Sequence, residues 1–308
     1  MTPSPAPGSP WSPWSAAATG RVTRGTLHGT AVTFLRSASG ATATIADHGA
    51  QLLSWCPAAQ DERLYLSENS GYADGEAIRG GVPVIFPQFG AMGPGRRHGV
   101  VRHRAWHAGA SGVESAGAVV WAQWEIADIL EVAPAAGFRL VLTVRLGEDW
   151  VEIALRIGNH GAGTLACQAA LHTYLRVSDL AHAALAGLHG CRYADQTLPP
   201  PAAQRRQSQE LLGFAGEIDR IYPQAPAALI LTHGRQRLAL QQRGFADTVV
   251  WNPGAAKAAA LGDLAPGGYR QFVCIEAAAV LTALQLGAGQ TWEGVQRLQA
   301  MRVDDTSC

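Results

Sequence analysis

The sequence predicts an all-β fold, an antiparallel sandwich or barrel with few short helices. From about residue 28 onward, apolar and polar residues alternate with a period of two, the spacing of strands with one buried face. Gly, Pro, Asp and His separate these runs, where an α/β protein would have long helical windows. Only residues 253–264 carry helix signals, because Asn252 can cap and Pro253 takes the first helical position before an alanine-rich turn.

The clearest strands form a hairpin. Apolar residues occupy every second position of 138–146, a Gly147-Glu148-Asp149 turn follows, and the alternation resumes in 151–157. This pattern predicts two antiparallel strands that share one buried face. The other predicted strands are 41–46, 50–55, 118–126, 165–177, 227–232, 235–241, 247–251 and 271–276.

The domain organisation predicted is simple. Residues 1–27 are rich in Pro, Ser, Gly and Ala, and we expect a disordered tail there. Residues 28–308 show no repeat, linker or composition break and are expected to form a single domain. The tail lacks the basic start and apolar stretch of a signal peptide, and no apolar run reaches the roughly 18 residues of a membrane span. We therefore expect a cytoplasmic protein with no membrane partner.

Cysteine usage agrees with a reducing compartment. The five cysteines are an odd number, are widely spread and include no C-x-x-C pair. This argues against a disulfide framework and against a cysteine zinc site.

The charge balance excludes a strong electrostatic attraction to polyanions. Lys+Arg and Asp+Glu number 24 each, and Lys257 is the only lysine. A nucleic-acid interface would need an extended basic surface, whereas residues 96–106 are an isolated basic stretch in a neutral chain. Because the planar guanidinium binds anions bidentately, a phosphate or carboxylate pocket is the better interpretation, with a solvated turn as the alternative.

Residues 79–90 do not read as an ordinary strand. The segment is apolar but contains Pro83 and Pro87, which cannot donate to a sheet ladder. Gly80 and Gly81 allow unusual backbone conformations or a close approach. We expect a rigid loop at one end of the sheet, either structural or part of a site.

His172 and Glu276 are the candidate acid and base. Each lies in an otherwise apolar strand-like run, and a buried carboxylate without a partner is costly. Such surroundings raise the pKa of a carboxylate towards the range in which a general base works. The alternative for His172 is an ordinary core histidine. No H-x-H or H-E-x-x-H spacing predicts a metal, and no G-x-S-x-G elbow predicts a hydrolase, so we expect a site without metal or cofactor.

Seven segments together resemble the glucose-6-phosphate 1-epimerase (hexose-6-phosphate mutarotase) family, within the aldose 1-epimerase superfamily. The resemblance covers about residues 30–298, and its most specific element is the R-G-G-x-P-x-x-F-P-Q-F-G loop. It implies a large antiparallel β-sandwich of the galactose-mutarotase type and no cofactor. The segments are Gly49–Trp55, Ile78–Gly90, His98–Arg102 with Trp106, Leu171–Tyr174, Glu217–Tyr222, Asp247–Pro253 and Val273–Glu276.

The resemblance also implies an activity. His172 would protonate the ring oxygen of a hexose 6-phosphate while Glu276 takes the proton of the C1 hydroxyl. The ring would open to the aldehyde, the C1–C2 bond would rotate, and the ring would close on the other face of the aldehyde. One departure concerns the residues after the glutamate. The family usually has Pro-Gly there, whereas this chain has Ala277 and Ala278, which predicts a less rigidly presented carboxylate.

The implied substrate-binding set has five members: His98 and Asp219 would hold sugar hydroxyls, Gln88 would line the pocket, and Arg79 and Arg102 would bind the phosphate. The expected partner is thus a small sugar phosphate, with the chain a monomer or weak dimer. Two other functions stay open: a mutarotase for unphosphorylated aldoses such as galactose, and a carbohydrate-binding sandwich without catalysis.

Overall fold

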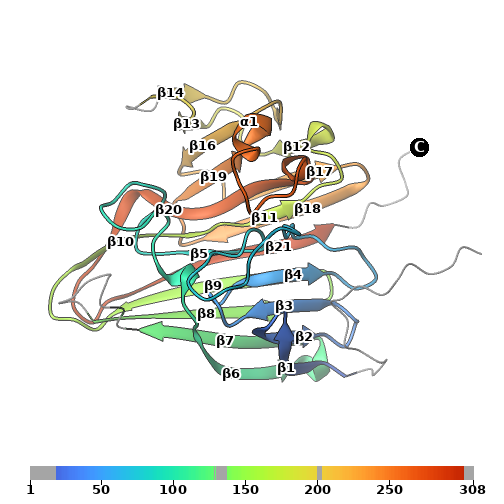
Figure 1. The fold of residues 1–308 in the computed structure, drawn as a ribbon, viewed down its shortest axis with the longest axis vertical. Coiled ribbons are helices and arrows are strands. Elements are labelled where there is room, and N and C mark those ends of the chain that lie inside the picture. The colour runs from blue at the N-terminus through green and yellow to red at the C-terminus, as the bar shows by residue number, and fades with distance from the viewer. Residues whose placement is uncertain (1–18, 128, 130–136, 200–202, 302–308) are drawn as a thin grey trace, which may run out of the picture.

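The structure, a computed structural model, describes residues 19–127, 129, 137–199 and 203–301. These residues form a sandwich whose strands lie in two layers, with the N-terminal strands beside β6 to β9 at one end and β13, β14 and β16 at the other (Figure 1). The first layer is a nine-stranded sheet, and the second consists of an eight-stranded and a four-stranded sheet. All the paired strands are antiparallel, so the predicted fold class is confirmed.

The nine-stranded sheet forms one complete layer. Its centre contains the predicted hairpin, with Phe138 opposite Asn159 and Leu146 opposite Val151. Its strands, in spatial order, are β15 (Leu211–Gly213), β12 (Ala183–Ala186), β17 (Ala228–His233), β18 (Gln236–Arg243), β21 (Thr291–Met301), β9 (Trp150–Asn159), β8 (Phe138–Leu146), β7 (Val119–Ala127) and β6 (His107–Glu114).

The eight-stranded sheet carries the candidate site. Its long central strand β20 pairs with β19 on one side and with β10 and then β11 on the other. Its strands, in spatial order, are β14 (Ala203–Arg206), β13 (Arg192–Asp195), β16 (Ile218–Pro223), β19 (Asp247–Asn252), β20 (Phe272–Leu286), β10 (Leu165–Leu171) and β5 (Val84–Ile85), with β11 (Tyr174–Arg176) beside β20.

The four-stranded sheet extends the second layer. It comprises β1 (Arg21–Leu27), β2 (Thr30–Arg36), β3 (Thr42–Ala46) and β4 (Leu52–Cys56) in sequential order. Its buried face contributes Leu35 and Trp55 to the same apolar cluster as Val120 and Trp124 of β7. The main core therefore lies between the layers and runs the length of the sandwich.

The proline-containing segment 79–90 joins the two sheets of the second layer. Val82 bridges to Leu52 of the four-stranded sheet, and β5 pairs with β10 of the eight-stranded sheet. Gly80 and Gly81 have φ of 122° and 58°, and a Cβ on either would lie 2.3 or 2.2 Å from a backbone carbonyl oxygen. Only glycine fits at this close approach, which confirms that the segment is a rigid junction and not an ordinary strand.

Helices are short, as predicted, but the main candidate is shorter than expected. The α-helix α1 (Gly254–Ala258) covers one turn of the helix predicted over 253–264. Pro253 is its N-cap residue, and the Asn252 side chain accepts a hydrogen bond from the Gly254 N–H. Figure 1 shows α1 beside the ends of β16 and β19. The 3-10 helices are η1 (Val101–His103), η2 (Ser115–Gly117), η3 (Leu180–His182) and η4 (Gly268–Gln271).

The predicted tail is too long. Residues 21–27 form β1, which pairs along its whole length with β2, while residues 1–18 lie outside the described residues. The strand was missed because Val22 and Leu27 are its only large apolar residues and its polar positions are half-buried or exposed. Among the described residues, no helix is long and apolar enough to cross a membrane.

Candidate active site

The outer face of the eight-stranded sheet carries the buried carboxyl group of Glu276. Glu276 lies within β20, which continues to Leu286, so the expectation that it ends its strand is wrong. Alternate residues of β20 enter the core between the layers, and Glu276 shares the opposite face with Phe272, Cys274, Ala278 and Val280. Both neighbouring strands pair with this part of β20, Val249 with Glu276 and Leu171 with Ala277. The backbone after Glu276 is therefore held on both sides without Pro-Gly.

The imidazole of His172 comes from the break between β10 and β11. Leu171 ends β10 opposite Ala277, and β11 resumes at Tyr174 opposite Cys274, so His172 lies beside Glu276 on the neighbouring strand. The His172 N–H donates to the Pro83 carbonyl over 3.0 Å. The proline-containing junction thus fixes the backbone of the histidine.

The two side chains face each other. His172 Nε2 lies 3.4 Å from Glu276 Oε1, and the residues are only 5% and 1% exposed. Neither carboxylate oxygen has a hydrogen-bond partner in the described structure, and neither does His172 Nδ1. Buried polar atoms are nearly always satisfied in folded proteins, so a close pair with three unsatisfied atoms marks a place where a ligand is expected to bond.

Aromatic rings hold the imidazole in place. The Tyr174 ring stacks on His172 with centroids 4.9 Å apart and an interplanar angle of 12°. Trp251 and His98 approach edge-on, with centroid distances of 5.7 and 5.3 Å. These contacts position His172 opposite Glu276 without occupying its nitrogen atoms.

Burial shifts the acidity of the carboxyl group. It raises the pKa of Glu276 well above its ordinary value, because the charged form loses its hydration. The negative charge of Asp219 raises this pKa further, whereas the positive charge of Arg102 lowers it. A base whose pKa lies nearer neutrality is a stronger proton acceptor than an exposed glutamate.

The pKa of the His172 imidazole shifts in the opposite direction. Burial lowers the pKa of His172 well below its ordinary value, and His98, Arg102 and Arg79 lower it further. In the free protein, the two shifts favour the uncharged carboxyl group of Glu276 and the uncharged imidazole of His172.

Arg79 reaches the pair through Tyr174. Its Nη1 donates to the Tyr174 hydroxyl over 2.9 Å, and its Nε donates to Asp263 over 3.0 Å. The Nη2 of Arg79 lies 2.9 Å from the same Asp263 oxygen. These partners raise the pKa of Arg79, so its positive charge is permanent but partly balanced.

Arg102 is less well balanced. Its Nε donates to Nε2 of His103 over 3.2 Å, and its Nη2 donates to the Arg97 carbonyl over 3.3 Å. Neither acceptor is charged. Burial, together with Arg79 and two other neighbouring arginines, lowers the pKa of Arg102 to about 10. Among the described residues Arg102 has no acidic partner, and a guanidinium surrounded by positive charges in this way is suited to an anionic ligand.

His98 and Asp219 contribute a donor and an acceptor. Nδ1 of His98 accepts from the Gly90 N–H over 3.2 Å, and burial and nearby arginines lower its pKa to about 3. His98 is therefore neutral, with its proton on Nε2. Asp219 of β16 pairs in register with Trp251 of β19, which in turn pairs with Cys274, two residues before Glu276 on β20. Burial raises the pKa of Asp219 to about 6. The described residues offer its carboxylate no hydrogen-bond donor.

Gln88 is arranged differently from the other predicted site residues. Its Nε2 donates to the carbonyls of Gly90, Gly93 and Gly95, and its Oε1 accepts from the Gly95 N–H. It lines a cavity of about 500 Å³ together with Arg96. The structure thus gathers the other six predicted residues around one point, whereas the Gln88 amide holds the glycine-rich turn that leads to His98.

The pair of His172 and Glu276, together with Cys274, has the donor atoms of a metal site. A nitrogen of His172, the sulfur of Cys274 and a carboxylate oxygen of Glu276 all lie within 4.8 Å of one another, and all three residues are buried. Sequence spacing did not reveal this group, because its histidine comes from another strand.

Three more residues that the sequence did not single out for a role support the site. Tyr174 and Trp251 pack on His172, and Asp263 pairs with Arg79 across 184 positions of the chain. The first two lie inside the quoted motifs and could have been found there. Asp263 follows an alanine-rich turn and has no local signal.

Comparison with known proteins identifies the family. The aldose 1-epimerase family model matches residues 32–299. A protein of Escherichia coli (strain K12) with the provisional name glucose-6-phosphate 1-epimerase is 34% identical over 245 residues, 77% of this chain and 79% of that protein. One of Cenchrus ciliaris with the same provisional name is 30% identical over 293 residues, 87% of this chain and 84% of that protein.

A solved structure agrees with the sequence comparison. YeaD of Salmonella typhimurium, provisionally described as a mutarotase, has a TM-score of 0.81 at 26% identity and covers 92% of this chain and 94% of its own. The chain belongs to the aldose 1-epimerase family of enzymes.

Proposed function

We propose that this enzyme interconverts the α and β anomers of a hexose 6-phosphate, with glucose 6-phosphate as the preferred substrate. The observation that carries this proposal is the unsatisfied pair of His172 and Glu276 with Arg102 beside it. The provisional names of the two sequence relatives point to the same substrate.

The chemistry needs one base and one acid, one for each of the two oxygen atoms bonded to the anomeric carbon. Glu276 takes the proton of the C1 hydroxyl while His172 gives a proton to the ring oxygen, so the C1–O5 bond breaks and an aldehyde forms. Rotation about C1–C2 then presents the other face of the aldehyde, and closure reverses both proton transfers. Each positioned group contributes about 10²–10⁴-fold to the rate.

The electrostatics link phosphate binding to this chemistry. In the free protein, the charges of Arg102 and Arg79 help to lower the pKa of His172. A bound phosphate would neutralise these charges and make the imidazole easier to protonate. A phosphorylated sugar would therefore favour the protonated His172 that the ring oxygen needs, whereas a neutral sugar would not.

The remaining polar groups suit a sugar. The neutral His98 offers an N–H donor and Asp219 offers an acceptor that is ionised at neutral pH, which is a typical arrangement for two hydroxyls. Gln88 acts indirectly in this proposal, by holding the turn that carries His98.

A second candidate is a mutarotase for unphosphorylated aldoses. One observation favours it, since Arg79 already has a carboxylate partner in Asp263 and needs no phosphate to balance its charge. The two candidates differ in what Arg102 contacts.

Anomer exchange measured by NMR on labelled glucose 6-phosphate, glucose and galactose tests the proposal. We expect a specificity constant at least about tenfold higher for glucose 6-phosphate, because one charge-assisted contact contributes about 1.5–3 kcal/mol. Equal or faster exchange on galactose would establish the second candidate instead.

A further inference from the structure

Cys274 is a buried thiol beside the candidate acid and base. It precedes Glu276 by two residues and shares the same face of β20, and it pairs in register with Tyr174 and Trp251. Its sulfur, a nitrogen of His172 and an oxygen of Glu276 lie within 4.8 Å of one another. Nothing in the ring-opening chemistry proposed above requires a thiol at this position.

The three groups have free coordination capacity. Both oxygens of Glu276 and Nδ1 of His172 lack hydrogen-bond partners in the described residues, and Cys274 is completely buried. Burial and the neighbouring Glu276 raise the pKa of the Cys274 thiol well above its ordinary value. The thiol is therefore inert towards oxidants and alkylating agents, and only a bound cation would make its thiolate stable.

Two arginines lie near the group and disfavour a positive charge on His172. The positive charge of Arg79 is paired with Asp263 at 2.9 Å, and the negative charge of Asp219 acts on Glu276 against that of Arg102. A thiolate and a carboxylate in the group itself would then balance the two charges of a divalent ion.

We propose that His172, Cys274 and Glu276 form an inhibitory binding site for a thiophilic divalent cation, with Zn²⁺ the best match. This inference rests on the proposed function, because inhibition follows from occupation of the acid and the base. Zn²⁺ prefers tetrahedral sites of imidazole, thiolate and carboxylate, and three protein ligands leave its fourth position to water. Mg²⁺ and Ca²⁺ prefer oxygen ligands and are expected to be excluded.

Binding changes the protonation of the site. The Cys274 S–H bond and the Glu276 O–H bond break, both protons leave to solvent, and sulfur–zinc and oxygen–zinc bonds form, while His172 binds through a neutral nitrogen. The ion then holds both groups that would move the substrate's protons. Zinc and sugar should exclude each other, and the metal-free enzyme is the active form.

Cobalt binding tests the site without any sugar. Co²⁺ added to the chelator-treated protein should bind at one ion per chain and give a thiolate-to-cobalt charge-transfer band that Zn²⁺ removes. Cys274→Ala and Cys274→Ser should lose this band, with folding checked by circular dichroism. The matched control is Cys167→Ala, since Cys167 is also buried but faces the core between the layers, and it should keep the band. A band that survives both Cys274 substitutions would overturn the proposal.

Zinc inhibition tests the consequence. Anomer exchange should survive EDTA, fall at least about a hundredfold with saturating Zn²⁺ and recover on chelation. Each Cys274 variant, compared with its own zinc-free rate, should need at least about tenfold more Zn²⁺ for half inhibition. Activation by Zn²⁺, or equal inhibition by Mg²⁺, would refute an inhibitory zinc site.

The two assays separate this inference from the proposed function. Exchange activity in a chain that gives no cobalt band would overturn the metal site and leave the mutarotase proposal intact. A Cys274-dependent band in a chain that exchanges no sugar would support the metal site and overturn the proposed function.

Discussion

Charged residues have opposite environments on the two outer faces of the sandwich. On the nine-stranded sheet, arginines pair with carboxylates of other strands at the surface, Arg243 with Glu293 of the neighbouring strand at 3.1 Å and Arg145 with Glu114 across β7 at 2.6 Å. On the outer face of the eight-stranded sheet, the described residues give the buried Glu276 no hydrogen bond, and the hydrogen bonds of the nearby Arg102 in η1 go to neutral acceptors. Exposed ion pairs contribute little, about 0–1 kcal/mol each, so the first face is a solvated surface.

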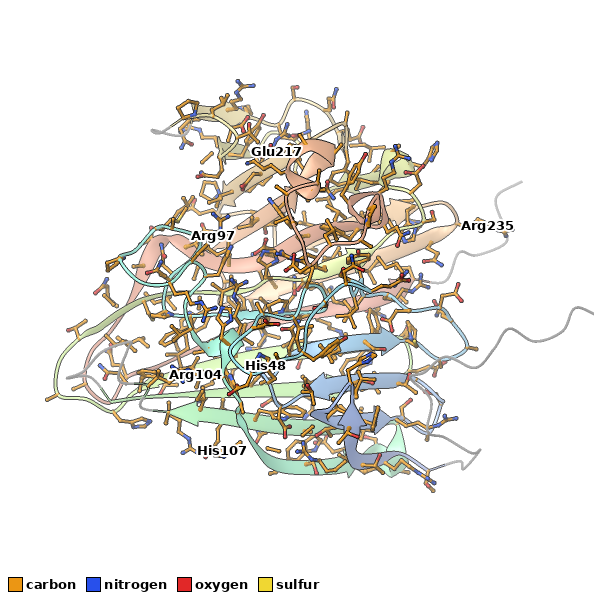
Figure 2. The ribbon with its side chains drawn as sticks, viewed as in Figure 1. His48, Arg97, Arg104, His107, Glu217 and Arg235 are labelled. Carbon is orange, nitrogen blue, oxygen red and sulfur yellow. The ribbon has the colours of Figure 1, made fainter. Side chains whose placement is uncertain are left out.

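The second face is organised for a ligand. Apolar clusters flank Glu276 along the sheet, one around Ile85 and Ala278 and one around Phe272 and Cys274. They desolvate the carboxylate without bonding to it, which destabilises its charge and raises its pKa. Figure 2 shows Arg97 and Glu217 towards the end of the molecule that carries α1, away from His107 at the β6 edge. The contrast teaches that burial without satisfaction, and not the number of charges, distinguishes the site.

The largest expected effect comes from removing the buried carboxylate. Glu276→Gln should slow anomer exchange by about 10²–10⁴-fold, because the amide cannot take a proton, while binding of the sugar phosphate is largely kept. Glu152→Gln, on the other outer face, is the matched control and should leave the rate unchanged. NMR exchange rates and calorimetric binding measure both. Normal exchange in the Glu276 variant would place the base elsewhere.

The second effect concerns the arginines. Arg79→Met and Arg102→Met should each lower the specificity constant for glucose 6-phosphate about ten- to a hundredfold, and much less for any activity on glucose. Arg96 and Arg97 would seem natural controls from the sequence, but both reach the electrostatic environment of Arg102. Arg145→Met on the outer face of the nine-stranded sheet is the cleaner control. Equal losses on both sugars would contradict phosphate recognition.

Whether a strand could be predicted from the sequence depends on whether its apolar and polar residues alternate. β8 and β9 alternate apolar and polar residues because one face meets solvent, and their predicted range agrees closely with the structure. β20 was predicted only to residue 276, because both of its faces are buried and the run after Glu276 does not alternate. β6 was missed because it is an exposed edge strand with no buried face to give a period.

Some features of the candidate site could be predicted from the sequence, and others could not. Glu276 and His172 could be found because a charged or titratable residue in an apolar run is conspicuous by itself. The pairing of Arg79 with Asp263, and the approach of Cys274 to His172, depend on segments that are distant in the sequence. No local pattern encodes such contacts, so only the fold reveals that Arg102 is the less balanced arginine.

Stability gives a third way to test the contrast. The folded-state pKa of Glu276 lies above its unfolded value, so its contribution to stability is fully present below the unfolded pKa and is lost as pH rises through the folded pKa. Glu276→Gln cannot ionise and should therefore raise the free energy of unfolding at mildly alkaline pH by about 1–3 kcal/mol. The gain should shrink at acidic pH.

The matched control for stability is again Glu152→Gln, which we expect to change the free energy of unfolding by less than about 0.5 kcal/mol at either pH. Denaturant unfolding at the two pH values measures both variants. A Glu276 variant that is destabilised most at alkaline pH would mean that the carboxylate has a stabilising partner, and the contrast between the two faces would be lost.

The smallest effect, and the most specific, is the pH profile of exchange. Below the pKa of Glu276 the base is protonated and the rate falls, so the acidic limb of the specificity constant reports its ionisation. Asp219 raises this pKa and Arg102 lowers it. Asp219→Asn should therefore move the limb to lower pH, and Arg102→Met should move it to higher pH, each by up to about one unit, because one unit corresponds to about 1.4 kcal/mol of interaction. The phosphate of the substrate titrates equally in every profile, so differences between variants cancel its contribution. Shifts of the same sign in both variants would show that the limb belongs to another group, and Glu276 could then not be the base.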